Sequence, residues 1–362
     1  MQRSARDARH ERPCLVKLAC LAPAGCPSSK GEVGPGRRRG GRPPWVITLR
    51  ATSALSRWEV LMKAVVLKSY GDVDALAVQD MPEPKVGPGE VKVRVTAAGI
   101  NPVDWKIRRG DMKAMMPLQF PTILGRDVAG EVMEVGPGVS DFKPGDRVMG
   151  VVNAGYAEKV VAPVESWAKV PESMDLKDAA ALPLVTLTGV QLMEEAVNPK
   201  KGDTVLVIGA LGAVGRAAVF AAKARGAKVL AGVRGSQKAE AQKLGVDGVF
   251  ALDVADEFSK LPMLDAVADT VGGQVVARVL EKVKPGGTLG SVLGEPPEAK
   301  GRQITVRAIL SHPDSRRLTQ LGQAVAKGDL VIPVSKRFPL EQVKEAQKLA
   351  EQGGVGKVLL VN

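Results

Sequence analysis

A buried strand, a glycine-rich turn and a helix follow one another in the middle of the chain. The apolar run 203–208 leads directly into the turn 209–215, and an Ala-rich helical pattern begins at Arg216. Glycines in such a turn let the backbone approach a pyrophosphate, and the helix N-terminus presents unpaired N–H groups to it. Because a second strand starts at Lys228, the spacing predicts a dinucleotide-binding turn. The residues expected to contact the cofactor here are Gly209, Ala210, Gly212, Ala213, Val214 and Gly215.

The sequence on the two sides of residue 186 has different patterns. Residues 62–185 contain short Val-rich strands separated by Gly/Pro turns, which is typical of a compact β-barrel-type domain. From residue 186 to 303, helical and strand patterns alternate, which indicates a doubly wound parallel sheet. The helices that we expect include residues 178–196, at the boundary between the two regions, and residues 274–287. The strand-like end of the chain predicts that residues 304–362 return to the first domain. We therefore expect an α/β fold with these two domains.

Residues 1–61 differ from the rest in composition. They hold 12 of the 51 Lys and Arg but only 4 of the 39 Asp and Glu, so most of the net charge of +12 lies there. They show no hydrophobic period. We interpret this leader as a mis-assigned start before Met62, with a targeting segment or a disordered tail as alternatives.

The remaining residues, from Met62 onward, have no dense basic stripe interleaved with aromatic residues, so the sequence does not favour a nucleic-acid partner. No uninterrupted apolar run approaches the roughly 20 residues that cross a bilayer. We therefore expect a cytoplasmic protein with no membrane contact.

The end of the second strand bears on the choice of cofactor. An NAD enzyme places an acid about 20 residues beyond the glycines to hold the ribose hydroxyls. Here Arg234, Ser236 and Lys238 follow the strand, and the first acid is Glu240. Cations suit a 2′-phosphate, so the sequence predicts NADPH. The alternative is that Arg234 and Lys238 are solvated surface charges.

The count of metal-ligating residues argues against a zinc site. A catalytic zinc takes three protein ligands and a structural zinc usually takes four, mostly Cys and His. After Met62 there is no cysteine, and His312 is the only histidine. We therefore expect no metal.

Several segments resemble the zinc-independent quinone oxidoreductase branch of the medium-chain dehydrogenase/reductase superfamily. They include "VRVTAAGINPVDWKIRRG", "PTILGRDVAGEVMEVGPGV", "AAALPLVTLTG", "VLVIGALGAVG", "VKPGGTLGSVLG" and "GKVLLV", in the family's order across residues 62–362. The resemblance implies a GroES-like catalytic domain, a Rossmann domain with a cleft between them, and a homodimer formed through an edge strand.

The resemblance also assigns roles to single positions. Asn101 and Arg126 stand where zinc-dependent relatives have a ligand cysteine and a ligand histidine. Thr188 matches a threonine near the nicotinamide, while Val271 and Leu293 lie in stretches that match loops flanking its ribose. Arg234 and Lys238 match the 2′-phosphate region.

The implied reaction is hydride transfer from NADPH to a quinone or to an enone or enal. Negative charge on the acceptor oxygen then needs hydrogen-bond donors, and our candidates are Asn101, Lys106 and Thr188. Asn101 could instead cap or turn the chain before Pro102, and Lys106 could be a solvated charge. Better-known quinone reductases often have tyrosines in the segment of Lys106 and Met112, so their absence weakens the case for quinone as the natural acceptor.

The sequence also bears on three other functions. A short-chain reductase would have its glycine motif at the N-terminus and a Tyr-x-x-x-Lys pair. Here the glycine motif is central, and Lys159 follows Tyr156 by three positions instead of four, so this function is excluded. Two alternatives stay open: a non-catalytic NADPH-binding protein linked to stress or RNA, and an enoyl-thioester reductase of the same superfamily. The first predicts cofactor binding without turnover.

Overall fold

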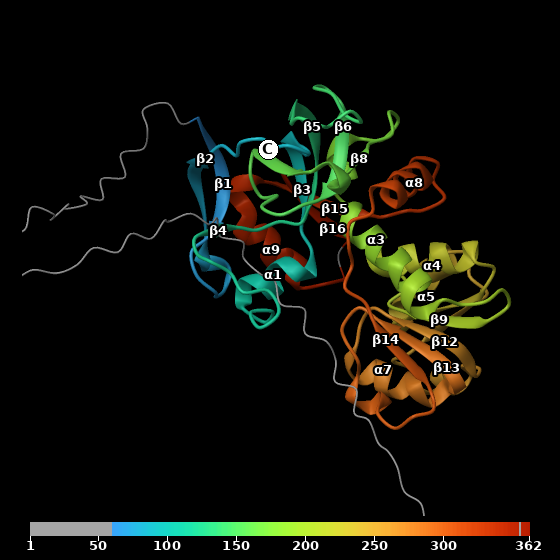
Figure 1. Ribbon diagram of the computed structural model, residues 1–362. Helices are drawn as coiled ribbons and strands as arrows, with labels where there is room; N and C mark the ends of the chain where they lie inside the picture. The colour runs from blue at the N-terminus through green and yellow to red at the C-terminus, as the bar shows by residue number, and fades with distance from the viewer. Residues whose placement is uncertain (1–59, 355) are drawn as a thin grey trace, which may run out of the picture. The chain divides into compact units, whose positions relative to one another are not determined.

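The computed structural model describes residues 60–354 and 356–362 (Figure 1). The predicted leader lies outside the described residues except for its last two positions. The first strand begins at Leu61, the last residue of that leader. None of the helices in the described part is long and apolar enough to span a bilayer.

The Val-rich regions form two sheets of mainly antiparallel strands. The larger sheet has the order β15-β16-β3-β5-β6-β8, with β7 also paired to β3, and the smaller has the order β2-β1-β4. Alternation explains β3, because Val91, Val93 and Val95 are buried on one face while Arg94 is exposed on the other. The strands are β1 (Leu61–Leu67), β2 (Leu76–Pro82), β3 (Glu90–Gly99), β4 (Thr122–Ile123), β5 (Asp127–Val135), β6 (Arg147–Val151), β7 (Lys159–Pro163), β8 (Trp167–Lys169), β15 (Val334–Pro339) and β16 (Lys357–Val361).

The alternating region forms a six-stranded sheet in the order β11-β10-β9-β12-β13-β14, and every neighbouring pair is parallel. The doubly wound prediction is confirmed. The strands are β9 (Thr204–Ile208), β10 (Lys228–Val233), β11 (Gly248–Ala251), β12 (Leu264–Asp269), β13 (Val283–Ser291) and β14 (Thr305–Ala308). β9 and β10 are buried along nearly their whole length, as expected for strands covered on both faces.

The helices differ from the sequence predictions in two places. The predicted helix 178–196 is divided into α2 (Leu176–Ala179), α3 (Pro183–Gln191) and the π-helical turn η3 (Leu192–Val197), because Pro183 starts a new helix at its first position. The remaining helices are α1 (Pro102–Arg109), α4 (Ala213–Ala224), α5 (Lys238–Gln242), α6 (Ala255–Ser259), α7 (Gly273–Val279), α8 (Ser315–Ala326) and α9 (Val343–Glu351).

The second difference is at the end of α7. The expected helix 274–287 is shorter than predicted, because α7 ends at Val279 and β13 begins at Val283. Pro285 and Gly286 cannot continue a helix, and the chain pairs with β12 instead. A related correction concerns the predicted return at residue 304, since β14 pairs with β13 and still belongs to the parallel sheet.

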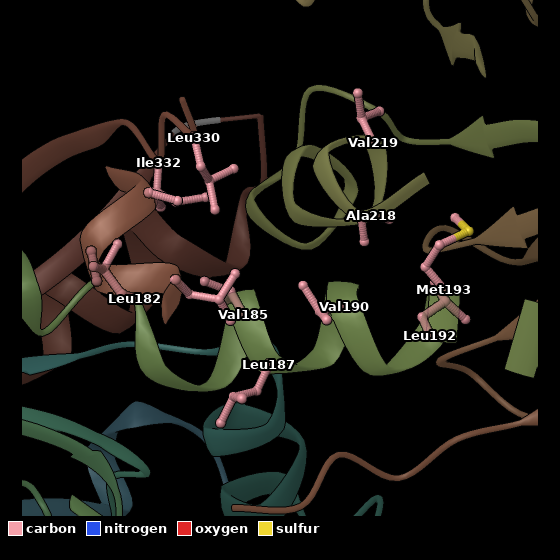
Figure 2. Packing of buried hydrophobic residues seen from close by; sticks show 14 of the residues in the cluster. Leu182, Val185, Leu187, Val190, Leu192, Met193, Ala218, Val219, Leu330 and Ile332 are labelled. Carbon is pink, nitrogen blue, oxygen red and sulfur yellow. The ribbon is translucent and has the colours of Figure 1, made fainter. Parts of the chain in front are cut away.

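Helix α3 packs against α4, the helix that follows the glycine turn. Figure 2 shows Val185 and Val190 pointing from α3 toward α4 and the Leu330–Ile332 segment, whereas Leu187 points to the opposite side. At Gly189 a Cβ would lie 2.3 Å from the carbonyl oxygen of Val214, so only glycine lets the two helices approach this closely. The packing therefore fixes the first turn of α4, where the glycine turn ends.

A buried glutamine joins the end of α3 to the segment between β14 and α8. The Gln191 Oε1 atom accepts hydrogen bonds from the Ser311 hydroxyl at 3.0 Å and from the His312 N–H at 3.1 Å, and Nε2 donates to the His312 carbonyl at 2.9 Å. The His312 Nε2 atom lies 3.1 Å from Glu195 Oε1. These contacts hold the returning chain against the helix that enters the parallel sheet.

Candidate functional site

One cleft of about 800 Å³ is lined both by the parallel-sheet region and by the barrel-type region. The glycine turn, the end of β10 and the loop after β12 form one part of its lining. The junction of β3 with α1 and the segment around Lys357 form another. The cleft thus brings together residues that the sequence analysis proposed separately.

The three glycines of the turn have different structural roles. Gly209 has φ +77°, a conformation that favours glycine, and a Cβ there would meet Thr270 Oγ1 at 2.6 Å. At Gly215 a Cβ would lie 2.1 Å from the Gly209 carbonyl oxygen, so the helix packs directly on the turn. Gly212 is the N-cap of α4, where a Cβ would meet only Gly209 O, at 3.3 Å. This open position leaves backbone room for a phosphate at the helix N-terminus.

The other predicted residues of the turn fall on both sides of it. Ala213 and Val214, together with the three glycines, line the cleft. Ala210 is fully buried beneath the turn. The predicted turn residues therefore lie together, although Ala210 supports the turn from the core.

Two neighbouring loops carry Val271 and Leu293. The buried carboxylate of Asp269 accepts the N–H groups of Val271 and Gly272 at 3.0 and 2.8 Å, and it also accepts the Ser291 hydroxyl at 3.0 Å. That hydroxyl oxygen accepts the Leu293 N–H at 3.1 Å. Val271 lines the cleft and is 54% exposed, and Leu293 is 46% exposed beside it. A single buried acid thus sets both loops predicted to flank the nicotinamide ribose.

The structure separates the three residues proposed for the 2′-phosphate. Arg234 follows β10, lines the cleft and pairs with no acid among the described residues. The Lys238 ammonium instead forms an ion pair with Glu257, whose pKa is lowered by that hydrogen bond. Neither Lys238 nor Ser236 is among the described residues that line the cleft. Arg234 is therefore the cation of this group that the cleft can present to a ligand.

Two further arginines of the cleft lining are absent from the sequence predictions. Arg216 directly follows Gly215 in the chain, and its guanidinium group forms an ion pair with Glu240 at 2.7 Å. Arg278 on α7 lies 4.3 Å from the Phe258 ring centroid and lines the cleft. The glycine motif itself marks Arg216 by position, but no signal in the sequence shows that α7 turns Arg278 toward the cleft.

Asn101 lies in a buried polar cluster rather than in open space. Its Nδ2 atom donates to Asp127 Oδ2 at 2.9 Å and to the Gly99 carbonyl at 3.4 Å, and its Oδ1 atom accepts from Lys357 Nζ at 2.7 Å. Lys357 also donates to the Ile100 carbonyl at 3.1 Å and to Asp127 at 3.5 Å. Both ends of the Asn101 amide are therefore occupied within the protein. Asn101 is also the N-cap residue of α1, which is the alternative noted from the sequence.

The Lys357–Asp127 ion pair is almost completely removed from water. The two side chains are 6% and 0% exposed. Burial lowers the pKa of Lys357 and raises the pKa of Asp127, while each opposes the effect on the other by its charge. The second oxygen of Asp127 accepts the Leu184 N–H at 2.8 Å, in the first turn of α3. This ion pair thus connects β5 and β16 with α1 and α3.

A second buried acid lies one helical turn from Asn101. Asp104 Oδ2 accepts the Asn101 N–H at 2.8 Å and the Tyr156 hydroxyl at 2.7 Å, whereas Oδ1 has no hydrogen-bond partner among the described residues. Burial raises the pKa of Asp104 to about 7, against the hydrogen bonds from Tyr156 and Asn101. Tyr156 is fully buried, and burial raises its own pKa.

The other two candidate donors lie outside the cleft lining. The Thr188 hydroxyl donates to the Leu184 carbonyl at 2.6 Å within α3. Lys106 is half-buried on α1 and forms no ion pair with a described residue. The described residues that line the cleft include neither of them. Asn101, Lys106 and Thr188 are therefore not brought together around one point, and their catalytic roles stay predictions.

An apolar wall faces the cleft near Asn101. Ile100, Pro102, Trp105, Val358 and Pro333 line it. Trp105 is absent from the sequence predictions, although it lies in the first turn of α1, just after the N-cap Asn101. The wall offers apolar and aromatic surface to a ligand.

The residues at the two former zinc-ligand positions have protein partners. Arg126 donates from Nη1 to Asn153 Oδ1 at 2.7 Å, and Asn101 lies against the Lys357 ammonium. Residues 60–354 and 356–362 contain no group of three or more His, Cys, Asp and Glu side chains arranged to hold a metal ion.

Comparisons with known proteins agree with this architecture. Residues 87–172 match the alcohol dehydrogenase GroES-like domain family, and residues 244–360 match the zinc-binding dehydrogenase family. The chain is 30% identical over 330 residues to a 2-haloacrylate reductase from Burkholderia sp, covering 83% of this chain and 99% of that protein. It is 38% identical over 199 residues to a chloroplast envelope quinone oxidoreductase homolog from Arabidopsis thaliana, covering 52% of this chain and 60% of that protein.

A solved structure extends the comparison to the fold. The quinone oxidoreductase from Coxiella burnetii superposes with a TM-score of 0.75 at 29% identity, covering 84% of this chain and all of that chain. The GroES-like region, the parallel six-stranded sheet and the similarity over 83% of this chain point to one family. This chain belongs to the quinone oxidoreductase-like branch of the medium-chain dehydrogenase/reductase superfamily.

Proposed function

We propose that the chain is an NADPH-dependent reductase that transfers hydride to a quinone or an α,β-unsaturated carbonyl compound without a metal ion. The observation that carries this proposal is the cleft, which joins a glycine turn suited to phosphates with an apolar wall that includes Trp105. Relatives named quinone oxidoreductase and 2-haloacrylate reductase support an electron-poor conjugated acceptor.

The residues around the glycine turn fit a dinucleotide. The open Gly212 position and the N–H groups at the start of α4 would hold the pyrophosphate. Arg234 would pair with the 2′-phosphate, while Val271 and Leu293 would cover the nicotinamide ribose. When bound, NADPH supplies the hydride for the reaction.

The Lys357 ammonium lies in the cleft lining beside the acceptor wall, with its charge paired to the Asp127 carboxylate. Because both ends of the Asn101 amide are occupied, Asn101 would act by holding the Lys357 ammonium in place rather than by donating to the acceptor. A buried cation stabilises negative charge that develops nearby more strongly than an exposed one. Lys106 and Thr188 remain candidates for direct contact, and water is a candidate proton source.

The same cluster supports chemistry without a metal. A divalent cation placed at Asn101 would lie against the Lys357 ammonium, which is held there by Asp127. The Lys357 ammonium already contacts Asn101 Oδ1 and Asp127 Oδ2, the oxygens that such a cation would need, and it would repel the cation. We expect EDTA treatment to leave turnover unchanged.

We also propose a cytoplasmic homodimer. β14 is the last strand in the order of the parallel sheet, and among the described strands it pairs only with β13. A free edge of this kind is suited to pairing with a second copy. Light scattering of the purified chain gives the mass directly, and a monomer would exclude this part of the proposal.

The deciding experiment measures consumption of NADPH by the purified full chain with quinones, enones, enals and enoyl-CoA esters, with NADH in parallel. Turnover with NADPH and little with NADH is expected, and the best acceptor identifies the substrate class. Preference for enoyl-CoA esters would replace the proposal with the enoyl-thioester reductase. NADPH binding without turnover on any acceptor would leave the non-catalytic NADPH-binding protein.

A further inference from the structure

An ion pair at the β10 end of the cleft has no part in the function proposed above. Arg216, in the first turn of α4, reaches from Nη2 to Glu240 Oε1 at 2.7 Å. Its Nε atom donates to the Leu211 carbonyl, inside the glycine turn, at 3.0 Å. The Arg216 side chain is 12% exposed and that of Glu240 is 57% exposed. Both residues line the cleft together with Arg234.

Glu240 is the first acid after β10, and its charge matters for the ligand. A carboxylate near the end of this strand accepts the ribose hydroxyls of NADH and repels the 2′-phosphate of NADPH. A free Glu240 would therefore oppose Arg234. Paired with Arg216, the Glu240 carboxylate adds no net charge and does not offset Arg234. The other acid at this end of the cleft, Asp253, accepts the Gly235 N–H at 2.8 Å.

We propose that Arg216 selects NADPH over NADH by neutralising Glu240. The inference depends on the proposed use of NADPH and adds the residue that sets the preference. Arg216 acts through Glu240, so it is a positioning residue rather than a catalytic one. The sequence alone would count Glu240 as a surface acid and Arg216 as an ordinary helix residue.

The second contact of Arg216 predicts a different effect. Its hydrogen bond to Leu211 stiffens the glycine turn, which both cofactors would use through the same pyrophosphate. Loss of that hydrogen bond weakens the binding of NADPH and of NADH by the same factor. Neutralisation of Glu240 changes only the ratio between them, so the ratio is the measurement that isolates the proposal.

The test compares full-chain variants Arg216→Ala, Glu240→Gln and the double variant. Isothermal titration measures the affinities for 2′,5′-ADP and 5′-ADP, and steady-state kinetics measures kcat/KM with NADPH and NADH. We expect Arg216→Ala to lower two ratios about tenfold: the affinity for 2′,5′-ADP over that for 5′-ADP, and kcat/KM with NADPH over that with NADH. The reason is that the substitution leaves the Glu240 carboxylate free to repel the 2′-phosphate. Glu240→Gln should keep the wild-type ratios, and the double variant should recover them. Lys223→Ala is the matched control, since Lys223 lies on α4 outside the cleft lining.

Three other results would overturn the proposal. Equal losses for both ligands in Arg216→Ala would leave Arg216 as a support of the glycine turn only. A double variant as impaired in ratio as Arg216→Ala would mean that the arginine contacts the phosphate itself. A wild-type chain that binds 2′,5′-ADP no better than 5′-ADP would refute the proposed use of NADPH, and this inference with it.

Discussion

The two ends of the cleft are built in different ways. The glycine turn presents backbone groups from a single short stretch, and its shape depends on missing side chains at Gly209 and Gly215. The acceptor end consists of buried side chains, with Asn101 and Lys357 256 positions apart in the chain. A backbone site tolerates many changes around its glycines, whereas a side-chain cluster depends on each of its partners.

The largest expected loss of activity tests the first half of this comparison. In Gly215→Ala the new Cβ would lie 2.1 Å from the Gly209 carbonyl oxygen, and neither backbone can move without shifting α4. We expect kcat/KM with NADPH to fall about 100-fold or more, since overpacking costs about 1–3 kcal/mol and distorts the turn as well. Gly212→Ala is the control for stability, because its Cβ meets only one atom, at 3.3 Å. Wild-type activity of Gly215→Ala would break the comparison.

Lys357→Met tests the dependence of the other end on its partners. The substitution leaves the fully buried Asp127 carboxylate without its cation. We expect the free energy of unfolding, measured by urea denaturation, to fall by about 3–5 kcal/mol. Combination with Asp127→Asn should recover part of the loss, because no uncompensated charge remains. A change below about 1 kcal/mol would mean that the cluster contributes little to stability.

Asp104 gives the acceptor end a dependence on pH that the glycine turn lacks. Burial raises the pKa of Asp104 to about 7, above the value of about 3.9 in an unfolded chain. The folded state therefore favours the protonated form, and this contribution is complete below about pH 4 and is lost as the pH rises through about 7.

Asp104→Asn removes this titration while keeping an oxygen for Tyr156 and for the Asn101 N–H. We expect the variant to gain stability relative to the wild type between about pH 5 and pH 8, on the order of a few kcal/mol. Thermal unfolding across this range measures the difference. Parallel curves for the two proteins would show that Asp104 does not titrate there.

The smallest expected effect distinguishes the two ends of the cleft by their separate KM values. We expect Trp105→Ala to raise the KM of the acceptor about threefold to tenfold, the range of an aromatic contact, without changing the KM of NADPH. Lys106→Ala on the same helix is the comparison, because the sequence named Lys106 and the cleft lining includes Trp105. An acceptor KM raised only in Lys106→Ala would favour the sequence prediction over the geometry.

The sequence predicted the backbone site well for a physical reason. A strand, a glycine turn and a helix are consecutive, so their local patterns already contain the geometry that Gly209 and Gly215 adopt. Val271 was found through resemblance, although its position is set by the buried Asp269. The pattern 274–287 misled us, because apolar spacing alone does not show where Pro285 joins a strand.

The acceptor end could not be read in the same way. Asn101 was a candidate hydrogen-bond donor to the acceptor, because no pattern near it in the sequence indicates that Lys357 and Asp127 lie beside it. Pairing in space between distant segments determines which side chains are occupied. Trp105 and Arg278 were missed for the same reason, because a helix shows its spacing but not which of its faces borders a cleft.

The distance along the chain between Asn101 and Lys357 has a consequence for synthesis. A ribosome adds about 5–20 residues per second, so the 256 positions between them take on the order of tens of seconds to translate. During that interval Asp127 has no ammonium partner, and the barrel-type region waits without its β16 strand. The nascent chain can therefore finish its parallel sheet before the wall of the acceptor site exists.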